Sequence, residues 1–190
     1  KYMKRNLIII LLLLPLALGA KNKFVDENRL KSDIMNSLSD FSRYLRVDFD
    51  QDNGVFKGEN TMASDEKGVR TNADLSMISA FLCRYGHVTS PELKNMARQS
   101  LDYALSTHKA VKLKACRDGK YWGSVSKNDN QWESSLWAMS VAYSAFFQWD
   151  DLSKSERDNV YKLLKAECNY ELERDIPTGY IGDTKAEENG

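Results

Sequence analysis

The feature that most constrains the fold of this chain is a series of helical stretches joined by connections of alternating length. Apolar residues recur at three- and four-residue steps, the period of a helix with a buried face, and strand patterns are nearly absent. The stretches that we expect to be helical are 26–47, 72–85, 91–108, 131–148 and 154–173. The sequence therefore predicts an all-α fold.

The lengths of the connections predict how these helices are arranged. Residues 86–90 and 149–152 are short connections, whereas 48–70, 109–129 and 174–183 are long and rich in Gly, Asp, Asn and Lys. A short turn between two helices produces an antiparallel hairpin. Because long and short connections alternate, we expect all the long loops to lie at one end of the helical array.

The helices that follow the long loops share a pattern at their starts. The starts recur roughly every 55–60 residues, a period that indicates stacked helical hairpins. The pairs at these starts are Thr71 with Asp74, Asn130 with Glu133, and Thr184 with Glu187. This spacing is that of a capping box, in which the first residue and the carboxylate three positions later bind each other's backbone N–H groups. Since function tends to reside on long loops held by a rigid scaffold, we expect this end to be the working face.

Two helices at the opposite end also carry start signals. Ser90 precedes Pro91 and Glu92, which predicts a cap followed by a first-turn proline. Ser153 with Glu156 forms another capping pattern.

Four carboxylates are candidates for catalysis: Glu133, Asp183, Glu187 and Glu188. A carboxylate at a helix start is stabilised in its ionised form by the helix dipole, which suits a base or a charge stabiliser. A general acid would instead need a pKa raised by burial or by a neighbouring carboxylate. Helix capping is the alternative interpretation for Glu133 and Glu187, whereas capping does not account for Asp183 or Glu188.

A second group of residues at the same end is suited to binding a substrate. The candidates are Arg70, Asn72, Tyr121, Trp122, Trp132 and Lys185. Arg70 and Asn72 offer a cation and an amide that could hold a carboxylate or neutralise an enolate. Flat aromatic rings suit the apolar face of a sugar. The alternatives are a solvated helix start for Arg70 and Asn72, and core packing for the aromatic residues.

The first 20 residues have the pattern of a signal peptide. Lys1 and Tyr2 precede Met3, the expected start, and a basic segment, the apolar run LIIILLLLPLAL and the small residues Gly19 and Ala20 follow. We expect a secreted or periplasmic protein with no membrane attachment after cleavage. Residues 21–190 then form the N-terminal part of one domain, truncated at its C-terminus.

Composition argues against several other partners. The chain has 27 basic and 27 acidic side chains, so no net field attracts nucleic acid. Neither His87 nor His108 lies at a metal-ligand spacing, and no phosphate-binding loop is present, so neither a metal nor a cofactor is expected. The three cysteines are Cys83, Cys116 and Cys168, and a Cys116–Cys168 bridge is compatible with an oxidising compartment. The oligomeric state stays open.

Three segments together resemble a known class of proteins. RTNADLSMISAFL, QWESSLWAMS and GDTKAEENG, with the leader and the alternating loops, look like secreted bacterial proteins of the (α/α) toroid class. These include polysaccharide lyases of the heparinase II/III type and six-hairpin glycosidases. The resemblance runs from about residue 24 to the end and covers the first half of such a toroid, so it implies antiparallel hairpins of an incomplete ring.

The resemblance implies polysaccharide or oligosaccharide degradation, with a carbohydrate as the partner. Lyases of this type use Asn or Arg to neutralise a uronate carboxylate, a role that Asn72 and Arg70 would suit. The hydrolases use paired carboxylates, a role that Asp183, Glu187 or Glu188 would suit. No histidine lies in the matching motifs, and the fragment by itself is expected to be inactive. The alternative function is a non-catalytic helical-repeat protein that binds glycan or protein through the same face.

Overall fold

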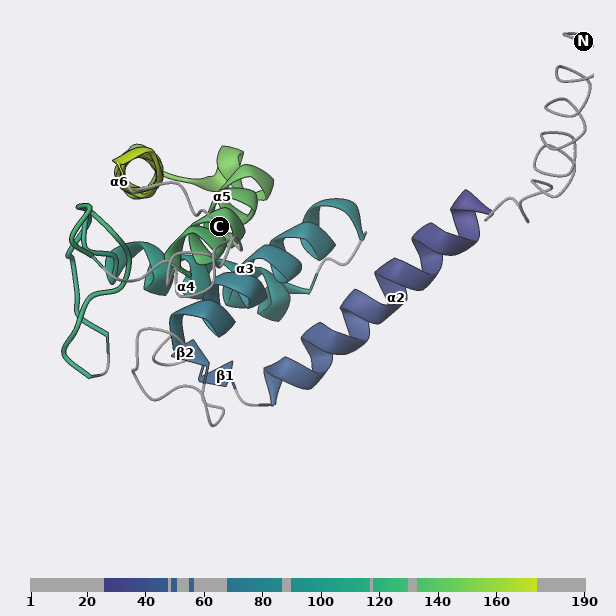
Figure 1. Cartoon of the computed structure of the whole chain (residues 1–190). Helices are drawn as coiled ribbons and strands as arrows, with labels where there is room; N and C mark the ends of the chain where they lie inside the picture. Colours follow the sequence, from purple (N-terminus) through teal and green to yellow (C-terminus); the bar gives the residue numbers. More distant parts are fainter. Residues whose placement is uncertain are drawn as a thin grey trace, which may run out of the picture. The chain divides into compact units, whose positions relative to one another are not determined.

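The computed structural model describes residues 26–47, 49–50, 55–56, 68–86, 90–116, 118–129 and 133–173. These form helices α2 (Glu27–Arg46), α3 (Gly68–Tyr85), α4 (Pro91–Ser106), α5 (Ser134–Phe147) and α6 (Lys154–Glu173), a 3-10 turn η2 (Trp149–Asp151), and strands β1 (Phe49–Asp50) and β2 (Val55–Phe56) (Figure 1). The predicted all-α class is confirmed. The five helices overlap the five predicted stretches, with differences of up to four residues at their ends.

The chain divides into two compact units, Lys1–Ser37 and Leu38–Gly190. In the first unit, the apolar stripe of α2 is about half exposed, at 47% for Leu30 and 48% for Ile34. The candidate site, the cleft and the groove described below belong to the second unit.

The two short strands form a small addition to the helical array. They pair antiparallel, with Phe49 opposite Phe56. Phe49 is buried in a small cluster with Leu75 of α3 and Met96 of α4. The strand pair therefore packs on the first hairpin, with Phe49 in a shared apolar cluster.

Helices α3 and α5 pack side by side and run in the same direction. In the first half of α3, Asp74 accepts a hydrogen bond of 2.7 Å from Ser140 Oγ, at the middle of α5. At their ends, Arg84 of α3 donates a 3.2 Å bond to the carbonyl oxygen of Phe147. The two helices therefore begin at the same end of the second unit, as the alternating connections predict for this pair.

Small polar residues allow three helices to approach one another closely. Ser76 of α3 donates to the carbonyl oxygen of Ala97 of α4 at 2.7 Å and lies 2.5 Å from Ser144 Oγ of α5. Gln148 Nε2 donates to Ser144 Oγ at 2.9 Å. These groups are buried, and each finds a partner, so the contact avoids the cost of an unpaired polar group.

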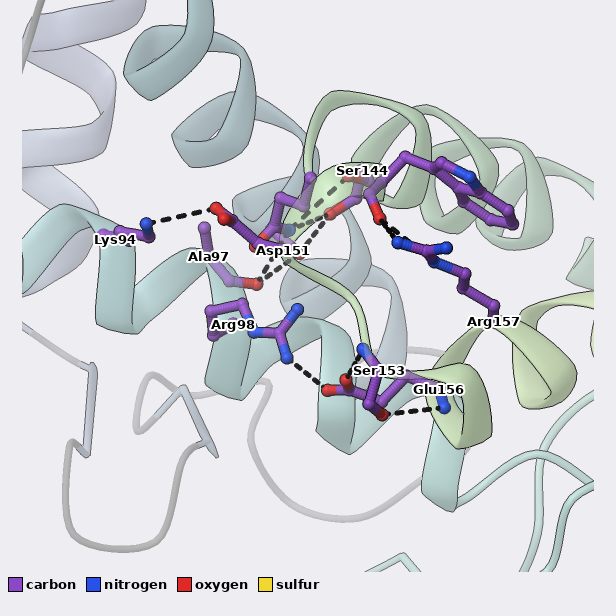
Figure 2. A network of polar contacts seen from close by, with 11 residues as sticks. Lys94, Ala97, Arg98, Ser144, Asp151, Ser153, Glu156 and Arg157 are labelled. Carbon is purple, nitrogen blue, oxygen red and sulfur yellow. Dashed lines mark hydrogen bonds and ion pairs between the residues drawn. The ribbon is translucent and has the colours of Figure 1, made fainter.

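The predicted helix caps at the short connections are confirmed. Ser90 accepts a 3.4 Å bond from the Leu93 backbone N–H, with Pro91 at the first helical position. Ser153 and Glu156 form a capping box, because each side chain accepts from the other residue's backbone N–H at 3.2 and 2.7 Å (Figure 2). Glu156 also pairs with Arg98 of α4, so the cap of α6 is tied to the first hairpin.

Candidate functional site

The shared beginning of α3 and α5 carries an ion pair on its surface. Arg70 Nε lies 4.0 Å from Asp74 Oδ2, and the side chains are 61% and 42% exposed. Burial raises the pKa of the Asp74 carboxyl above its ordinary value, and the Ser140 hydrogen bond and the Arg70 charge offset this shift only in part. A half-exposed carboxylic acid with a raised pKa is a chemical group that the sequence patterns did not single out.

The capping box predicted for Thr71 and Asp74 is wrong. Helix α3 begins at Gly68, so Thr71 is already inside the helix. Asp74 instead points to the neighbouring helix, where it accepts the bond from Ser140. The Asp74 carboxylate therefore takes part in a tertiary contact between α3 and α5, and not in a local cap. A signal was available in the i,i+4 spacing of Arg70 and Asp74, which places both on one helix face.

Glu133 lies at the same end but is not part of the predicted cap with Asn130. It is half-buried and occupies the N-cap position of α5 itself, without a side-chain capping bond. Asn130 lies outside the described residues. Glu133 thus stands at the start of α5, where the first backbone N–H groups have no intrahelical partner.

Two of the predicted binding residues are buried. Asn72 is 1% exposed and Trp122 is 0% exposed. The Trp122 indole N–H donates to the carbonyl oxygen of Ala104 at 2.9 Å, and its ring packs against Trp137. A ligand in solvent reaches neither side chain in this structure, so for both residues the binding prediction is corrected to a core position.

The neighbouring aromatic residue has a different environment. Tyr121 is half-buried, and the Lys112 ammonium group lies 5.8 Å from the centre of its ring. Tyr121 therefore remains a surface candidate. The other predicted residues lie outside the described part of the chain, and they are Trp132, Asp183, Lys185, Glu187 and Glu188.

Beneath this end lies a buried polar cluster that the sequence reasoning missed. Glu167 of α6 accepts hydrogen bonds from His108 Nε2, the Ser124 backbone N–H and the Ser134 hydroxyl, at 2.8, 2.8 and 2.7 Å. Ser124 and Ser134 also lie 3.1 Å apart through their hydroxyl groups. The cluster joins the loop after α4, the start of α5 and the body of α6.

The hydrogen-bond pattern determines which ring nitrogen of His108 carries the hydrogen. His108 Nδ1 accepts from the Ala110 backbone N–H at 3.0 Å. Nε2 therefore carries the hydrogen and donates it to Glu167. With its two nitrogens engaged and its side chain 0% exposed, His108 is a structural residue. No spacing in the sequence linked it to Glu167.

A cleft lies at the opposite end, beside the short connections. It has a volume of about 580 Å³ and is bounded by the end of α3, the start of α4 and η2. An ion pair of 3.1 Å between Lys94 and Asp151 borders it (Figure 2). Burial raises the pKa of the Cys83 thiol in its wall, and the Lys94 charge opposes that shift. The expectation that the long loops carry the function did not include this cleft.

The cysteines are all free thiols in the structure. Cys116 is buried, Cys83 is half-buried and Cys168 is exposed. The Cys116–Cys168 bridge compatible with the sequence is therefore not formed.

Among the described residues, no group of three or more His, Cys, Asp or Glu side chains has the arrangement of a metal site. Within the same ranges, the helices are too short or too polar to cross a bilayer. Comparison of the chain with protein-family models, with curated proteins and with solved structures found no match.

Proposed function

We propose that this chain is part of a secreted or periplasmic (α/α) toroid that acts on carbohydrate, by polysaccharide lyase or glycoside hydrolase chemistry. The observation that carries the proposal is the parallel packing of α3 and α5, which brings Arg70, Asp74 and the start of α5 at Glu133 to one end. The Arg70 cation could bind an acidic polymer, and two carboxylates in different environments could take different catalytic roles.

The environments of the two carboxylates favour different roles. Asp74 has a raised pKa, which suits a group that donates a proton. Glu133 stands at a helix start, a position that suits a charge stabiliser. Arg70 would bind a substrate carboxylate, and Tyr121 would offer a ring to a sugar face. Asp183, Glu187 and Glu188 remain candidates on the strength of the resemblance.

An exposed apolar stripe on α5 supports the toroid part of the proposal. Met139, Tyr143 and Phe146 lie on one face of α5 and are 50%, 50% and 60% exposed. Tyr143 and Phe146 lie 62 residues after Phe81 and Arg84 of α3. These two α3 residues contact Phe147 of α5, through rings with centres 5.4 Å apart and through the 3.2 Å hydrogen bond to its carbonyl oxygen. A further parallel helix would cover this stripe by repeating the α3–α5 contact, as in a continuing ring of hairpins.

A non-catalytic helical-repeat protein that binds glycan is the second candidate. The partial exposure of the Arg70–Asp74 pair favours it, because a pair open to solvent can bind an acidic polymer without any reaction. The two candidates differ in what Asp74 does, since only a catalyst needs its proton.

Affinity electrophoresis of the chain through gels that contain uronate-rich or neutral polysaccharides tests binding. We expect uronate-rich polymers to retard the wild-type chain, and Arg70→Ala to lose most of this retardation. Arg29→Ala is the matched control, because Arg29 and Asp33 form a similarly spaced, exposed i,i+4 pair at 3.8 Å. Equal mobility of all three proteins in every gel would remove this end from carbohydrate binding.

Turnover separates the two candidates in a form of the protein that contains the complete ring. Asp74→Asn should abolish the release of unsaturated or reducing sugar ends while the retardation is kept. A binding protein would release no product either as wild type or as the Asp74→Asn variant. The ultraviolet absorbance of an unsaturated product would distinguish lyase from hydrolase.

A further inference from the structure

An apolar groove runs between α5 and α6. It has a volume of about 510 Å³ and is lined by Ala138 and Met139 of α5 and by Leu164, Cys168 and Leu172 of α6, among others. Met139 is 50% exposed and Leu172 is 84% exposed, so within the described ranges these walls face solvent. Apolar surface of this kind is stabilised when another apolar group covers it.

The two hairpins are equivalent at a nearly constant shift. Helix α5 ends at Phe147, 62 residues after α3 ends at Tyr85. Helix α6 is capped by Ser153, 63 residues after Ser90 caps α4. Positions in the first hairpin can therefore be matched to positions in the second.

The match shows what the groove corresponds to. The groove residues Ala138, Leu164, Glu167, Cys168 and Leu172 correspond to Ser76, Leu101, Ala104, Leu105 and Lys109. In the first hairpin this position is filled by Trp122, whose indole N–H donates to the Ala104 carbonyl and whose own carbonyl accepts from the Lys109 N–H at 2.8 Å. Leu101 and Leu105 belong to the same core cluster as Trp122. The groove is thus the second hairpin's counterpart of the Trp122 site.

The sequence around Trp122 recurs after α6. Trp122 lies in Arg117-Asp118-Gly-Lys-Tyr121-Trp122-Gly123, and the later segment reads Arg174-Asp175-Ile-Pro-Thr-Gly-Tyr180-Ile181-Gly182. Both segments begin with Arg-Asp and end with Tyr, a large apolar residue and Gly. They follow equivalent helices, α4 and α6.

We propose that residues 174–182 dock onto the α5–α6 groove, with Ile181 as the counterpart of Trp122. Leu172, in the last turn of α6, lines the groove, and the segment begins two residues later. The eight residues from Arg174 to Ile181 span up to about 27 Å when extended. A groove lined by so few side chains is well below the roughly 800 Å² per partner of a stable dimer, which favours a segment of the same chain.

The docking has a consequence for the surface at the start of α5. Gly182 corresponds to Gly123, and Asp183 then corresponds to Ser124, whose backbone N–H and hydroxyl lie beside Glu167 and Ser134. The docked segment would bring Asp183 to the end where α3 and α5 begin. The docking itself does not depend on the proposed action on carbohydrate.

The natural thiols of the chain provide the test. Wild-type protein is treated with N-ethylmaleimide, and the labelling rate of each cysteine is followed by mass spectrometry of its peptide. We expect Ile181→Asp to speed the labelling of Cys168 by about tenfold, because a covered thiol reacts only when its cover opens. Ile176→Asp, the same change at a position of the segment without a counterpart in the repeat, should leave the rate unchanged.

Cys83 lies in the distant cleft and Cys116 is buried in the first hairpin, so both report on global folding in the same samples. If Ile181→Asp also exposes Cys116, the smaller change Ile181→Ala replaces it. Equal Cys168 rates in wild type and both Ile181 variants would overturn the proposal. If the protection of Cys168 rises with protein concentration and does not change in the Ile181 variants, a second copy of the chain covers the groove. That result would also overturn the proposal.

Discussion

Nε2 of His108 lies 2.8 Å from Oε1 of Glu167 and joins residues 59 positions apart in the sequence. The contact links the loop after α4 to α6, and Ser134 extends it to the start of α5. Polar atoms buried in such a cluster are costly when any one partner is removed. Substitutions in this cluster therefore test how much the contact between the two hairpins contributes to stability.

Gly123 is required by this cluster. Its φ is +96°, and an added Cβ would overlap the His108 imidazole and lie 2.8 Å from Glu167 Oε1. Gly123→Ala should lower the free energy of unfolding by about 3 kcal/mol or more, measured by urea denaturation. Gly119→Ala is the matched control, because Gly119 has a φ of +81° but an added Cβ there meets no atom within 4 Å. Gly119→Ala should lower the free energy of unfolding by only about 1–2 kcal/mol, because a side chain strains the left-handed backbone. If both substitutions lower it equally, the contact with His108 does not contribute.

Glu167→Gln should destabilise the protein although the side chain keeps its size. Glu167 accepts three hydrogen bonds, and the tautomer fixed by Ala110 makes His108 a donor toward it. A glutamine amide turns an NH₂ group toward at least one donor, at a cost of about 2–3 kcal/mol. Thermal unfolding of Glu167→Gln and of the exposed control Glu173→Gln measures the difference. Matching melting curves for the two variants would contradict the proposed donor pattern.

Asp129 should make the protein sensitive to acid. Burial of the Asp129 carboxyl raises its pKa, but hydrogen bonds from Lys109 and the Val125 and Ser126 N–H groups outweigh burial, so the net pKa is lowered below 3.8. A lowered pKa means that the ionised group adds stability at neutral pH, and that this contribution disappears as the pH falls below about 4. We expect Asp129→Asn to be less stable at pH 7 and to lose less stability on acidification.

The control for Asp129 is an exposed aspartate in a similar turn. Asp118 accepts a 3.0 Å bond from the Lys120 N–H, so Asp118→Asn changes the same atoms at a site where water competes. Denaturation between pH 7 and pH 3 compares the variants. If Asp129→Asn loses as much unfolding free energy between pH 7 and pH 3 as Asp118→Asn and wild type do, Asp129 is not a source of the acid sensitivity.

Ser140 should hold down the pKa of Asp74. Burial raises that pKa, and the Ser140 hydroxyl, at 2.7 Å, is the first of two groups that oppose the rise. Ser140→Ala should therefore move the Asp74 titration to higher pH, followed by carbon-13 NMR of the carboxyl group, with Asp118 as the reference signal. A raised pKa means that the ionised carboxylate destabilises the fold, so wild type should lose stability as the pH rises above 3.8. Asp74→Asn has no group to ionise there and should not show this loss. A titration that stays in place or moves to lower pH in Ser140→Ala would refute this assignment.

Sequence patterns predicted the helices well because those patterns act over a few residues. The apolar period predicted where the helices form, although the stripes of α2 and α5 are about half exposed. The Ser90–Pro91 start and the Ser153–Glu156 box depend on neighbours within one turn, and both are confirmed. The same reasoning failed for Thr71 and Asp74, where the spacing is that of a cap but the helix begins earlier, at Gly68. A local pattern cannot show that Asp74 gains a better partner in α5.

The arrangement of the helix starts was predicted more accurately than the exposure of the side chains assigned to them. The alternation of connections placed the starts of α3 and α5 at one end, and the contact of Asp74 with Ser140 agrees. Of the aromatic and polar residues assigned to that end, Asn72 and Trp122 are buried in the core. Loop residues carry no period, so nothing in the order of residues 118–123 indicates which ring turns inward.

The sequence by itself determined where helices form, how several of them are capped and which connections are long, because these follow from backbone hydrogen bonding and side-chain period within a few residues. Only the tertiary structure decided that Trp122 fills the space beside Ala104 and that Glu167 gathers donors from His108, Ser124 and Ser134. Those contacts join residues 18 to 59 positions apart. Hydrogen bonds of this kind are strengthened where water is excluded and every polar atom has a partner, a condition that exists only once the hairpins have packed.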